Sequence, residues 1–192
     1  MQKIIPLPCV IVAGGRSSRM GKDKALLPFH NHKTLVEYQL ARLSHNFESL
    51  HVSCKTKEKF AFKASFIEDV KDFEEYSPLV ALYSILKKFD KPVAILSVDT
   101  PFVTKRVYEK LLYSLDEDTD IVIARSPFGS HQMCAIYKPY IADIIKTQIE
   151  QNNHKIRALF EKLHVKYVDF EDDAIFMNLN HPDDYENAKK ML

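Results

Sequence analysis

Three of the four glycines in this 192-residue chain fall in one short segment that also carries much positive charge. The glycines are Gly14, Gly15 and Gly21, and the basic residues among and after them are Arg16, Arg19, Lys22 and Lys24. Glycine lets a bound group approach the main chain closely, and successive backbone N–H groups form a concave anion site. Arginine binds phosphate through a fork of donors, and lysine acts as a point charge. The segment therefore predicts a loop that holds the phosphates of a nucleotide.

This loop differs from two common phosphate-binding motifs. In a P-loop, four residues separate the first glycine from Gly-Lys-Ser/Thr, whereas here five residues separate Gly15 from Gly21, and Asp23 replaces Ser or Thr. The GxGxxG pattern of dinucleotide-binding proteins is also absent from the sequence. A basic surface loop is the alternative. The loop directly follows an apolar run, Cys9–Ala13, and this position favours a ligand site.

Asp99 is the leading candidate for a metal ligand. It directly follows Val93–Val98, the most apolar run in the chain, so it is expected at the end of a buried strand. Magnesium prefers hard oxygen ligands, often one or two carboxylates together with substrate phosphates. The alternative is that Asp99 only starts a turn in the sequence Asp-Thr-Pro.

Three further polar residues follow expected strands or precede an expected helix. Asp69 comes after the short run Ser65–Ile67 and could bind a ribose hydroxyl or a metal-bound water, or be a solvated loop charge. Asn178 and Asn180 alternate around a leucine, so their side chains can point the same way. A contact to metal or phosphate is one possibility for them, and a helix cap at Asn180 is the other.

Short apolar runs alternate with amphipathic stretches along the whole chain. The expected strands are Cys9–Ala13, Leu50–Cys54, Ser65–Ile67, Pro92–Val98, Ile121–Ala124, Met133–Tyr137 and Val165–Phe170. The expected helices are Leu35–Leu43, Pro78–Phe89, Thr104–Leu115, Pro139–Gln151, Ile156–Leu163 and His181–Met191. This order predicts a three-layer α/β sandwich with a mostly parallel, Rossmann-like sheet, and ligands bind such sheets beyond the carboxyl ends of the strands. No linker composition divides the chain, so one domain is expected over residues 1–192.

Composition narrows the class of protein further. The formal net charge is only +1, so no general basic field predicts a nucleic-acid partner. Cys9, Cys54 and Cys134 are odd in number and form no CxxC pair, which argues against a zinc ribbon or a disulfide framework. The N-terminal residues do not resemble a signal peptide, and no apolar run is long enough for a membrane span. A soluble cytoplasmic protein is expected.

Taken together, these motifs resemble those of molybdenum cofactor guanylyltransferases of the MobA type. This family lies in the nucleotidyltransferase group, which includes sugar-phosphate and isoprenoid cytidylyltransferases and shares the fold of nucleotide-diphospho-sugar transferases. The matching motifs follow the family's order over nearly the whole chain: the segment from Val12 to Lys24, Asn31–Tyr38, Asp69, Ser77–Leu82, Val98–Phe102 and Met177–Asp184.

The resemblance implies specific roles for these residues. Val12, Ala13, Gly14 and Gly15 would line the nucleotide, Lys24 would contact phosphate, Asp69 would bind the nucleoside, and Asp99 would hold Mg²⁺. Arg19 is a further candidate for a catalytic phosphate contact. The reaction that the resemblance implies joins GTP and molybdopterin to give the guanine dinucleotide form of the molybdenum cofactor and diphosphate. Proteins that insert this cofactor, and client molybdoenzymes, are the further partners implied.

One motif departs from the family pattern. The usual Gly-Pro-Leu-Ala-Gly loop is replaced by Ser77–Ala81, which lacks both glycines, and Cys54 stands where the family often has asparagine. The family loop helps to seat the base. Three alternatives therefore stay open: CTP as the nucleotide, another nucleotide with a small phosphate substrate, or a non-catalytic nucleotide-binding adaptor for molybdenum enzymes.

Overall fold

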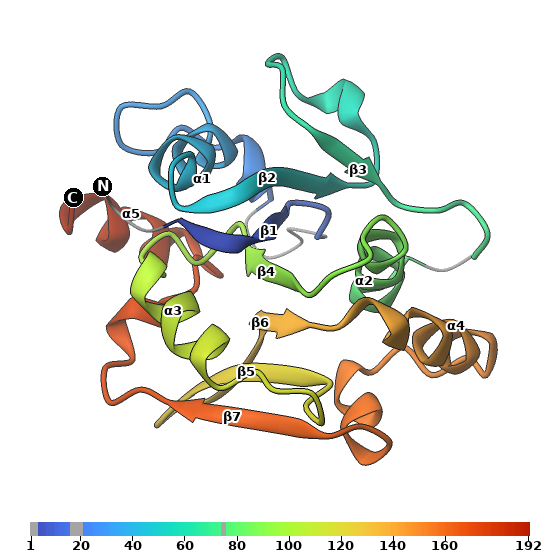
Figure 1. Cartoon of the computed structure of the whole chain (residues 1–192). Helices are drawn as coiled ribbons and strands as arrows, with labels where there is room; N and C mark the ends of the chain where they lie inside the picture. Colours follow the sequence, from blue (N-terminus) through green and yellow to red (C-terminus); the bar gives the residue numbers. More distant parts are fainter. Residues whose placement is uncertain (1–3, 16–20, 74–75) are drawn as a thin grey trace.

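A computed structural model of the chain describes residues 4–15, 21–73 and 76–192. Its described strands form one sheet in the order β3-β2-β1-β4-β6-β5-β7, with β3 and β7 at opposite edges (Figure 1). The strands are β1 (Ile5–Val12), β2 (Phe47–Cys54), β3 (Phe66–Glu68), β4 (Val93–Ser97), β5 (Ile121–Ser126), β6 (Gly129–Tyr137) and β7 (Val165–Asp169).

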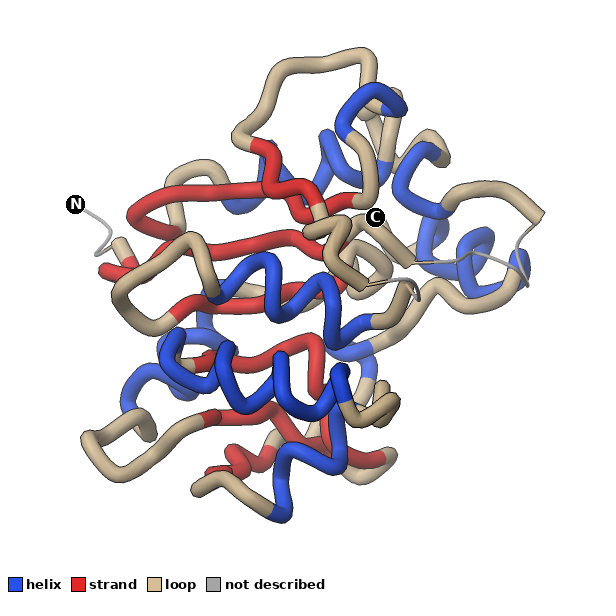
Figure 2. The backbone as a smooth tube through the Cα atoms, turned by 90° about the vertical axis from the view of Figure 1, so that its right-hand side faces the viewer, coloured by secondary structure: helices blue, strands red, loops and turns tan. Residues whose placement is uncertain are grey.

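Helices cover both faces of this sheet, as the alternation of strands and helices predicts (Figure 2). One face packs against α1 (Leu35–Leu43), α3 (Lys105–Tyr113) and α5 (Pro182–Lys190). The other face packs against α2 (Pro78–Leu86) and α4 (Ala142–Glu150). Short 3-10 turns complete the described elements: η1 (Lys24–Leu26), η2 (Lys57–Lys59), η3 (Pro139–Ile141), η4 (Ile156–Glu161) and η5 (Ala174–Phe176). The three-layer α/β sandwich is confirmed.

The helices that follow β1 and β3 begin at residues suited to the first turn. Thr34 caps α1 by accepting a hydrogen bond from the backbone N–H of Glu37 at 3.1 Å. Ser77 caps α2 in the same way through Val80, and Pro78 occupies the first turn, where its missing N–H costs nothing. The segment without glycines, Ser77–Ala81, therefore forms the N-terminal cap and first turn of a buried helix.

The expected start of β6 and the expected helix after Lys155 are wrong. Strand β6 begins at Gly129 instead of Met133, and it runs antiparallel to both β4 and β5 within the mostly parallel sheet. Only two residues separate β5 from β6, which is enough for a hairpin and too few for a parallel crossover. The segment after Lys155, expected as an α-helix, is the 3-10 turn η4.

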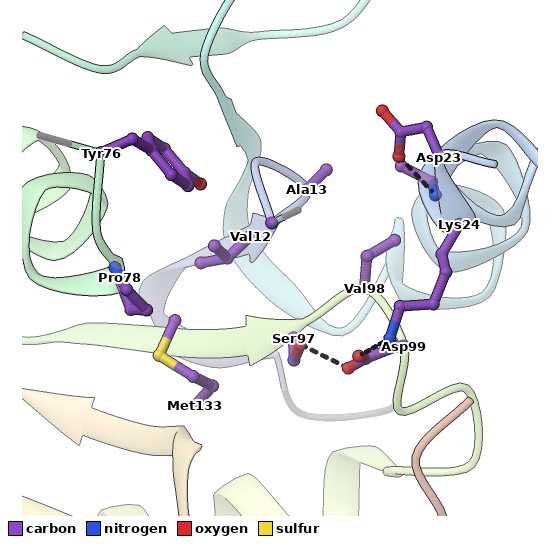
Figure 3. A pocket seen from close by; sticks show the side chains of 12 residues that line it. Val12, Ala13, Asp23, Lys24, Tyr76, Pro78, Ser97, Val98, Asp99 and Met133 are labelled. Carbon is purple, nitrogen blue, oxygen red and sulfur yellow. Dashed lines mark hydrogen bonds and ion pairs between the residues drawn. The ribbon is translucent and has the colours of Figure 1, made fainter. Parts of the chain in front are cut away.

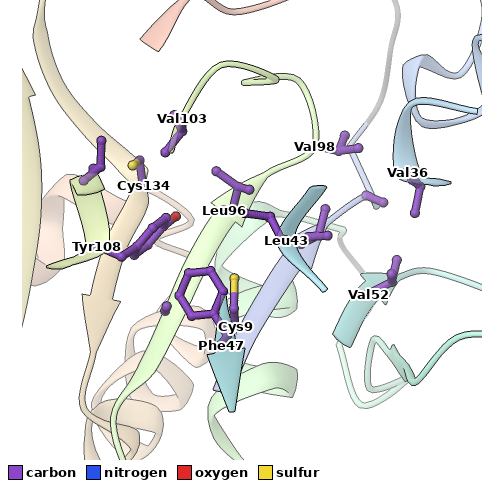
Figure 4. Close-up of a cluster of buried hydrophobic side chains, with 14 of the residues drawn as sticks. Cys9, Val36, Leu43, Phe47, Val52, Leu96, Val98, Val103, Tyr108 and Cys134 are labelled. Atoms are coloured by element: carbon purple, nitrogen blue, oxygen red, sulfur yellow. The ribbon is translucent and has the colours of Figure 1, made fainter. Parts of the chain in front are cut away.

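The core beneath α1 and α3 contains all three cysteines, and Figure 4 shows two of them, Cys9 and Cys134. Cys9 on β1 and Cys134 on β6 are fully buried free thiols, and burial raises the pKa of both, so they stay protonated. Tyr108 of α3 lies in the same core and donates its hydroxyl to the carbonyl of Ile95 at 2.7 Å. None of the helices in the described parts of the chain has the length and apolar character needed to cross a membrane.

Candidate active site

A cavity of about 350 Å³ opens where β1 and β4 end (Figure 3). Its lining divides into two halves. One half is largely apolar and is formed by Val12, Tyr76, Pro78 and Met133 (Figure 3). The other half is polar and charged, and its side chains belong to Asp23, Lys24, Ser97 and Asp99, with Gly15 and Ala25 nearby. Val98 lies beside Lys24 and Asp99, and Ala13 also lines the cavity. Strands β1 and β4 are parallel neighbours, so their carboxyl ends bring these residues together.

Asp99 lies in this cavity, directly after β4, as the sequence predicts. Its Oδ2 lies 2.7 Å from the ammonium of Lys24, and its Oδ1 accepts a hydrogen bond from the hydroxyl of Ser97 at 2.5 Å. Both charged side chains are only 15% exposed, so the ion pair is shielded from bulk water. The structure therefore joins two of the predicted catalytic residues in one contact.

A buried glutamine that sequence reasoning missed forms hydrogen bonds with the backbone on both sides of Asp99. Gln39 of α1 donates its amide to the carbonyls of Val98 and Thr100, at 3.0 and 3.3 Å. These residues flank Asp99 on both sides. A buried amide on an amphipathic helix is a weak signal in the sequence, because its partners are about 60 residues away.

The structure separates the roles of the two predicted asparagines. The Oδ1 of Asn180 accepts from Lys24 at 3.2 Å, so this residue joins the charged half of the site. Asn178 instead donates its side chain to the carbonyl of Phe176 at 3.3 Å. The helix-cap alternative for Asn180 is wrong, because His181 is the N-cap residue and Asp184 accepts the backbone N–H groups of both residues at 3.0 and 2.8 Å.

A second lysine that sequence reasoning missed ties together the two sides of the glycine loop. The ammonium of Lys59 in η2 donates to the carbonyl of Ala13 at 2.9 Å and to Oδ2 of Asp23 at 2.7 Å. Asp23 also accepts from the backbone N–H of Ala25 at 3.0 Å, which starts η1 and aims Lys24 at Asp99. Spacing gives no signal for Lys59, because its partners lie 46 and 36 residues away.

The glycines of the loop meet different demands. Gly21 has a φ of +65°, a conformation that suits glycine. A Cβ at Gly14 would lie 2.5 Å from the hydroxyl of Tyr76, so this position is closed by packing, whereas Gly15 faces open space and lines the cavity. Arg19 lies outside the described residues, and its phosphate contact stays a prediction.

Asp69 lies beside the site in a second cavity of about 390 Å³, lined by Lys55, Thr56, Val70, Lys71, Phe73, Tyr76 and Val80. It follows β3, and its backbone N–H donates to the carbonyl of Cys54 at 3.0 Å. Neither buried carboxylate oxygen has a hydrogen-bond partner among the described residues. Burial raises the pKa of Asp69 to about 6, while Lys55 and Lys59 act in the opposite direction. Such a carboxylate is poised to accept hydrogen bonds.

His131 lies within β6. Its ring stacks on Phe176 with centroids 4.1 Å apart, and its Nε2 lies 2.8 Å from the hydroxyl of Ser126. The stack holds the segment that leads to Asn180 against the sheet. Met133, two residues further along β6, is the residue of this strand that lines the cavity.

The oxygen atoms around Lys24 suit a hard divalent cation. The carboxylate of Asp99 and the amide oxygen of Asn180 already share one positive charge, the Lys24 ammonium. The described residues contain no group of three histidine, cysteine or acidic side chains that could hold a metal by itself. A metal bound here would therefore complete its coordination with the phosphates of the substrate and with water, as Mg²⁺ commonly does.

Several solved structures share this fold. The molybdopterin-guanine dinucleotide biosynthesis protein A of Archaeoglobus fulgidus has a TM-score of 0.83 at 23% identity, covering 96% of this chain and 98% of that one. The manganese complex of Rv0371C from Mycobacterium tuberculosis has a TM-score of 0.67 at 15% identity, covering 98% and 100%. Both solved structures thus show that this chain shares their α/β fold.

Sequence comparison identifies the family to which this chain belongs. The model of the MobA-like NTP transferase domain matches residues 9–167. The molybdenum cofactor guanylyltransferase of Campylobacter jejuni strain RM1221 is 41% identical over 187 residues, covering 97% of each chain. The chain belongs to the MobA-like NTP transferase family, as its motifs predict.

Proposed function

We propose that this protein transfers GMP from GTP to molybdopterin, which gives the guanine dinucleotide form of the molybdenum cofactor and diphosphate. The observation that carries the proposal is that Lys24, which lines the cavity beside the glycine loop together with Asp99, contacts both Asp99 and Asn180. The name of the relatives at 41% identity supports the choice of substrates. Residues 1–192 would act as one nucleotidyltransferase domain.

The reaction joins three negatively charged groups, so positive charge is its main requirement. A terminal phosphate oxygen of the pterin attacks the α-phosphorus of GTP, and the bond from that phosphorus to the bridging oxygen of diphosphate breaks. The attacking phosphate is already ionised, so no general base is needed. Lys24 would leave Asp99 for the phosphates and stabilise the departing diphosphate together with the backbone N–H groups of Gly14 and Gly15. Arg19 would add a second cationic contact.

Asp99 would hold Mg²⁺, with Asn180 as a further oxygen ligand. When bound, such a cation supplies positive charge that neutralises phosphate oxygens in the transition state. The hard oxygen donors of this chain fit that ion, and the structurally similar manganese complex fits a divalent metal in this fold. In this structure the ammonium of Lys24 contacts the carboxylate of Asp99. A divalent ion would take the place of this ammonium beside Asp99.

Diphosphate release from each of the four NTPs, with magnesium and molybdopterin, tests this proposal directly. GTP should be the active nucleotide, and release should stop when molybdopterin is left out. Activity with CTP instead of GTP would show that the enzyme prefers cytosine to guanine. This outcome is worth testing because Ser77–Ala81 lacks the two glycines of the family loop that helps to seat the base. Tight binding of GTP without turnover would indicate the adaptor alternative.

Asp99→Ala is the matching variant. It should lose most of the activity and keep its melting temperature close to that of the natural chain. A fully active Asp99→Ala would remove the metal assignment while leaving the transferase activity in place.

A cytoplasmic site of action completes the proposal. The three cysteines are free thiols in the structure, which suits a reducing compartment. The dinucleotide product would pass to proteins that insert the cofactor and then to client molybdoenzymes. Tracking the purified product into an apo-molybdoenzyme, with and without a cofactor-insertion protein, tests this order of transfer.

A further inference from the structure

Tyr76 stands between the two cavities of the site. Its side chain lines the 350 Å³ cavity that contains Lys24 and Asp99, and also the 390 Å³ cavity that contains Asp69. Among the residues that the structure describes, it is the one that lines both cavities. Figure 3 shows its ring projecting from the loop before α2 toward the end of β1, opposite Lys24. A nucleotide whose phosphates reach Lys24 would therefore have its nucleoside close to this ring.

The ring is held in place from two sides. The Tyr76 hydroxyl packs against Gly14, where a Cβ would come within 2.5 Å of it. The ammonium of Lys55, which lines the Asp69 cavity, lies 4.5 Å from the ring centroid. A cation at this distance is attracted by the π-electrons of the ring. Tyr76 is thus an ordered, half-buried aromatic surface and not a loose side chain at the cavity mouth.

The chemistry of the lining determines which part of a nucleotide meets Tyr76. Phosphates belong at the charged half, with Lys24 and the glycine loop. The half around Tyr76 also contains Val12, Pro78 and Met133, which offer apolar contact and no positive charge to a phosphate. A flat, partly apolar nucleobase suits this half, because bases stack on aromatic side chains.

We propose that Tyr76 is the nucleobase-stacking residue of this enzyme, with its ring placed by Gly14 and Lys55. The proposal rests on the proposed function and adds to it a residue that binds the base. Stacking accepts any base, since every base has a π-face. Tyr76 therefore supplies affinity for the nucleoside, and hydrogen-bonding groups around it, Asp69 among them, supply the choice between bases.

Direct binding measurements separate the nucleoside contact from the phosphate contacts. The probes are Mg-GTP, Mg-CTP and magnesium tripolyphosphate, titrated calorimetrically against the natural chain, Tyr76→Ala, Tyr76→Leu and Tyr76→Phe. Tyr76→Ala should weaken binding of both nucleotides about 10-fold or more, the usual effect of losing one base–aromatic stack. Tyr76→Leu, which keeps apolar volume, should lose affinity as well, whereas Tyr76→Phe should bind normally. Tripolyphosphate should bind equally to all four proteins.

Tyr113→Ala is the matched control, because this tyrosine lies on α3, is 93% exposed and lines neither cavity. Unchanged nucleotide affinity in Tyr76→Ala and Tyr76→Leu would overturn the inference and leave the transferase function intact. Tighter binding in these variants would also overturn it, because the ring would then be an obstacle. An equal loss of tripolyphosphate affinity would show a phosphate role instead. A natural chain that binds no nucleotide would refute the proposed function together with this inference.

Discussion

Lys24 and Asp99 form a partly buried ion pair, 2.7 Å apart, between residues separated by 75 positions in the chain. The pair closes the charged half of the cavity, and Asn180 accepts a second hydrogen bond from the same ammonium. The lysine can therefore move from its carboxylate to a phosphate while an amide oxygen still accepts from it. The pair therefore holds a positive charge for the phosphates of a nucleotide and a negative charge for a metal ion.

The two asparagines of the C-terminal segment should differ sharply in effect. Asn180→Ala removes an acceptor from Lys24, and hydrogen bonds to charged groups are worth roughly 1.5–3 kcal/mol, so kcat/KM should fall about 10-fold or more. Asn178→Ala is the matched control, since its side chain donates to Phe176, and its kcat/KM should stay within about twofold. Steady-state diphosphate release measures both. Equal losses in the two variants would contradict the separation of roles.

Gly14 and Tyr76 should show strong coupling in a double-mutant cycle. Gly14→Ala places a methyl group 2.5 Å from the tyrosine hydroxyl, so the ring must shift and nucleotide affinity should fall. The φ of Gly14 is not in the left-handed region, so alanine brings only this steric conflict. In a Tyr76→Phe background, the nearest remaining ring atom is 3.5 Å away, an ordinary contact. Gly14→Ala should then bind GTP almost normally.

The measurement for this cycle is the Kd of Mg-GTP in the four combinations. A coupling free energy near zero would mean that alanine at position 14 acts on the phosphates and not on the ring.

Asp69 predicts a pH dependence with a definite sign. Burial raises its pKa from 3.8 to about 6, so the folded protein binds a proton that the unfolded chain has released in this range. The free energy of unfolding should therefore fall as pH rises from 3.8 to about 6, and this contribution should be constant above that range. Asp69→Asn should lack this component. Urea unfolding of both proteins at several pH values provides the comparison.

Nucleotide binding should respond to the same carboxylate in the opposite direction. If ionised Asp69 accepts hydrogen bonds from the nucleoside, GTP affinity should rise as pH passes through about 6. The phosphates of GTP also titrate in this region, so Asp69→Asn must be measured alongside. The same pH profile in both proteins would exclude Asp69 as the source.

Lys59 should act as a positioning residue for the glycine loop. Lys59→Met removes the links to Ala13 and Asp23, so the loop should lose its alignment, and the KM for GTP should rise about 5-fold or more with a smaller change in kcat. Lys57→Met is the control from the same turn, because Lys57 pairs with Glu68 and is 56% exposed. Lys59→Arg, which keeps the charge, should restore part of the affinity. If Lys59→Met changes only the melting temperature and leaves KM normal, Lys59 stabilises the fold and does not position the glycine loop.

Much of the site could be predicted because it obeys a local rule. The glycine loop and Asp99 each come within two residues of the end of an apolar strand, and the strands pair as parallel neighbours, so their carboxyl ends meet at one cavity. The hairpin of β5 and β6 also had a signal that went unused: two short apolar runs separated by only eight residues, which include Pro-Phe-Gly. A parallel crossover needs more chain than these residues provide.

The remainder depends on tertiary partners that no local pattern encodes. Lys59 and Gln39 look like ordinary helix-turn residues in the sequence, yet each holds backbone groups of the site from a distant segment. Asn180 could cap a helix or face the cavity, and the outcome was decided by Asp184, which takes the backbone N–H groups at the helix start. Tyr76 likewise gains significance only from tertiary contacts, with Gly14 and with Lys55.

The C-terminal segment also sets the order in which the site is completed during translation. The backbone N–H of Leu179 donates to the carbonyl of Asp99 at 2.9 Å, and Asn180 follows it to reach Lys24. Among the described residues around this ion pair, Asn180 is the last to leave the ribosome. A nascent chain can thus assemble β1 and β4 while its lysine and aspartate still lack this partner. Full competence for nucleotide should arise only after residue 180 has left the ribosome, so ribosome-stalled chains ending before residue 179 should have an incomplete site.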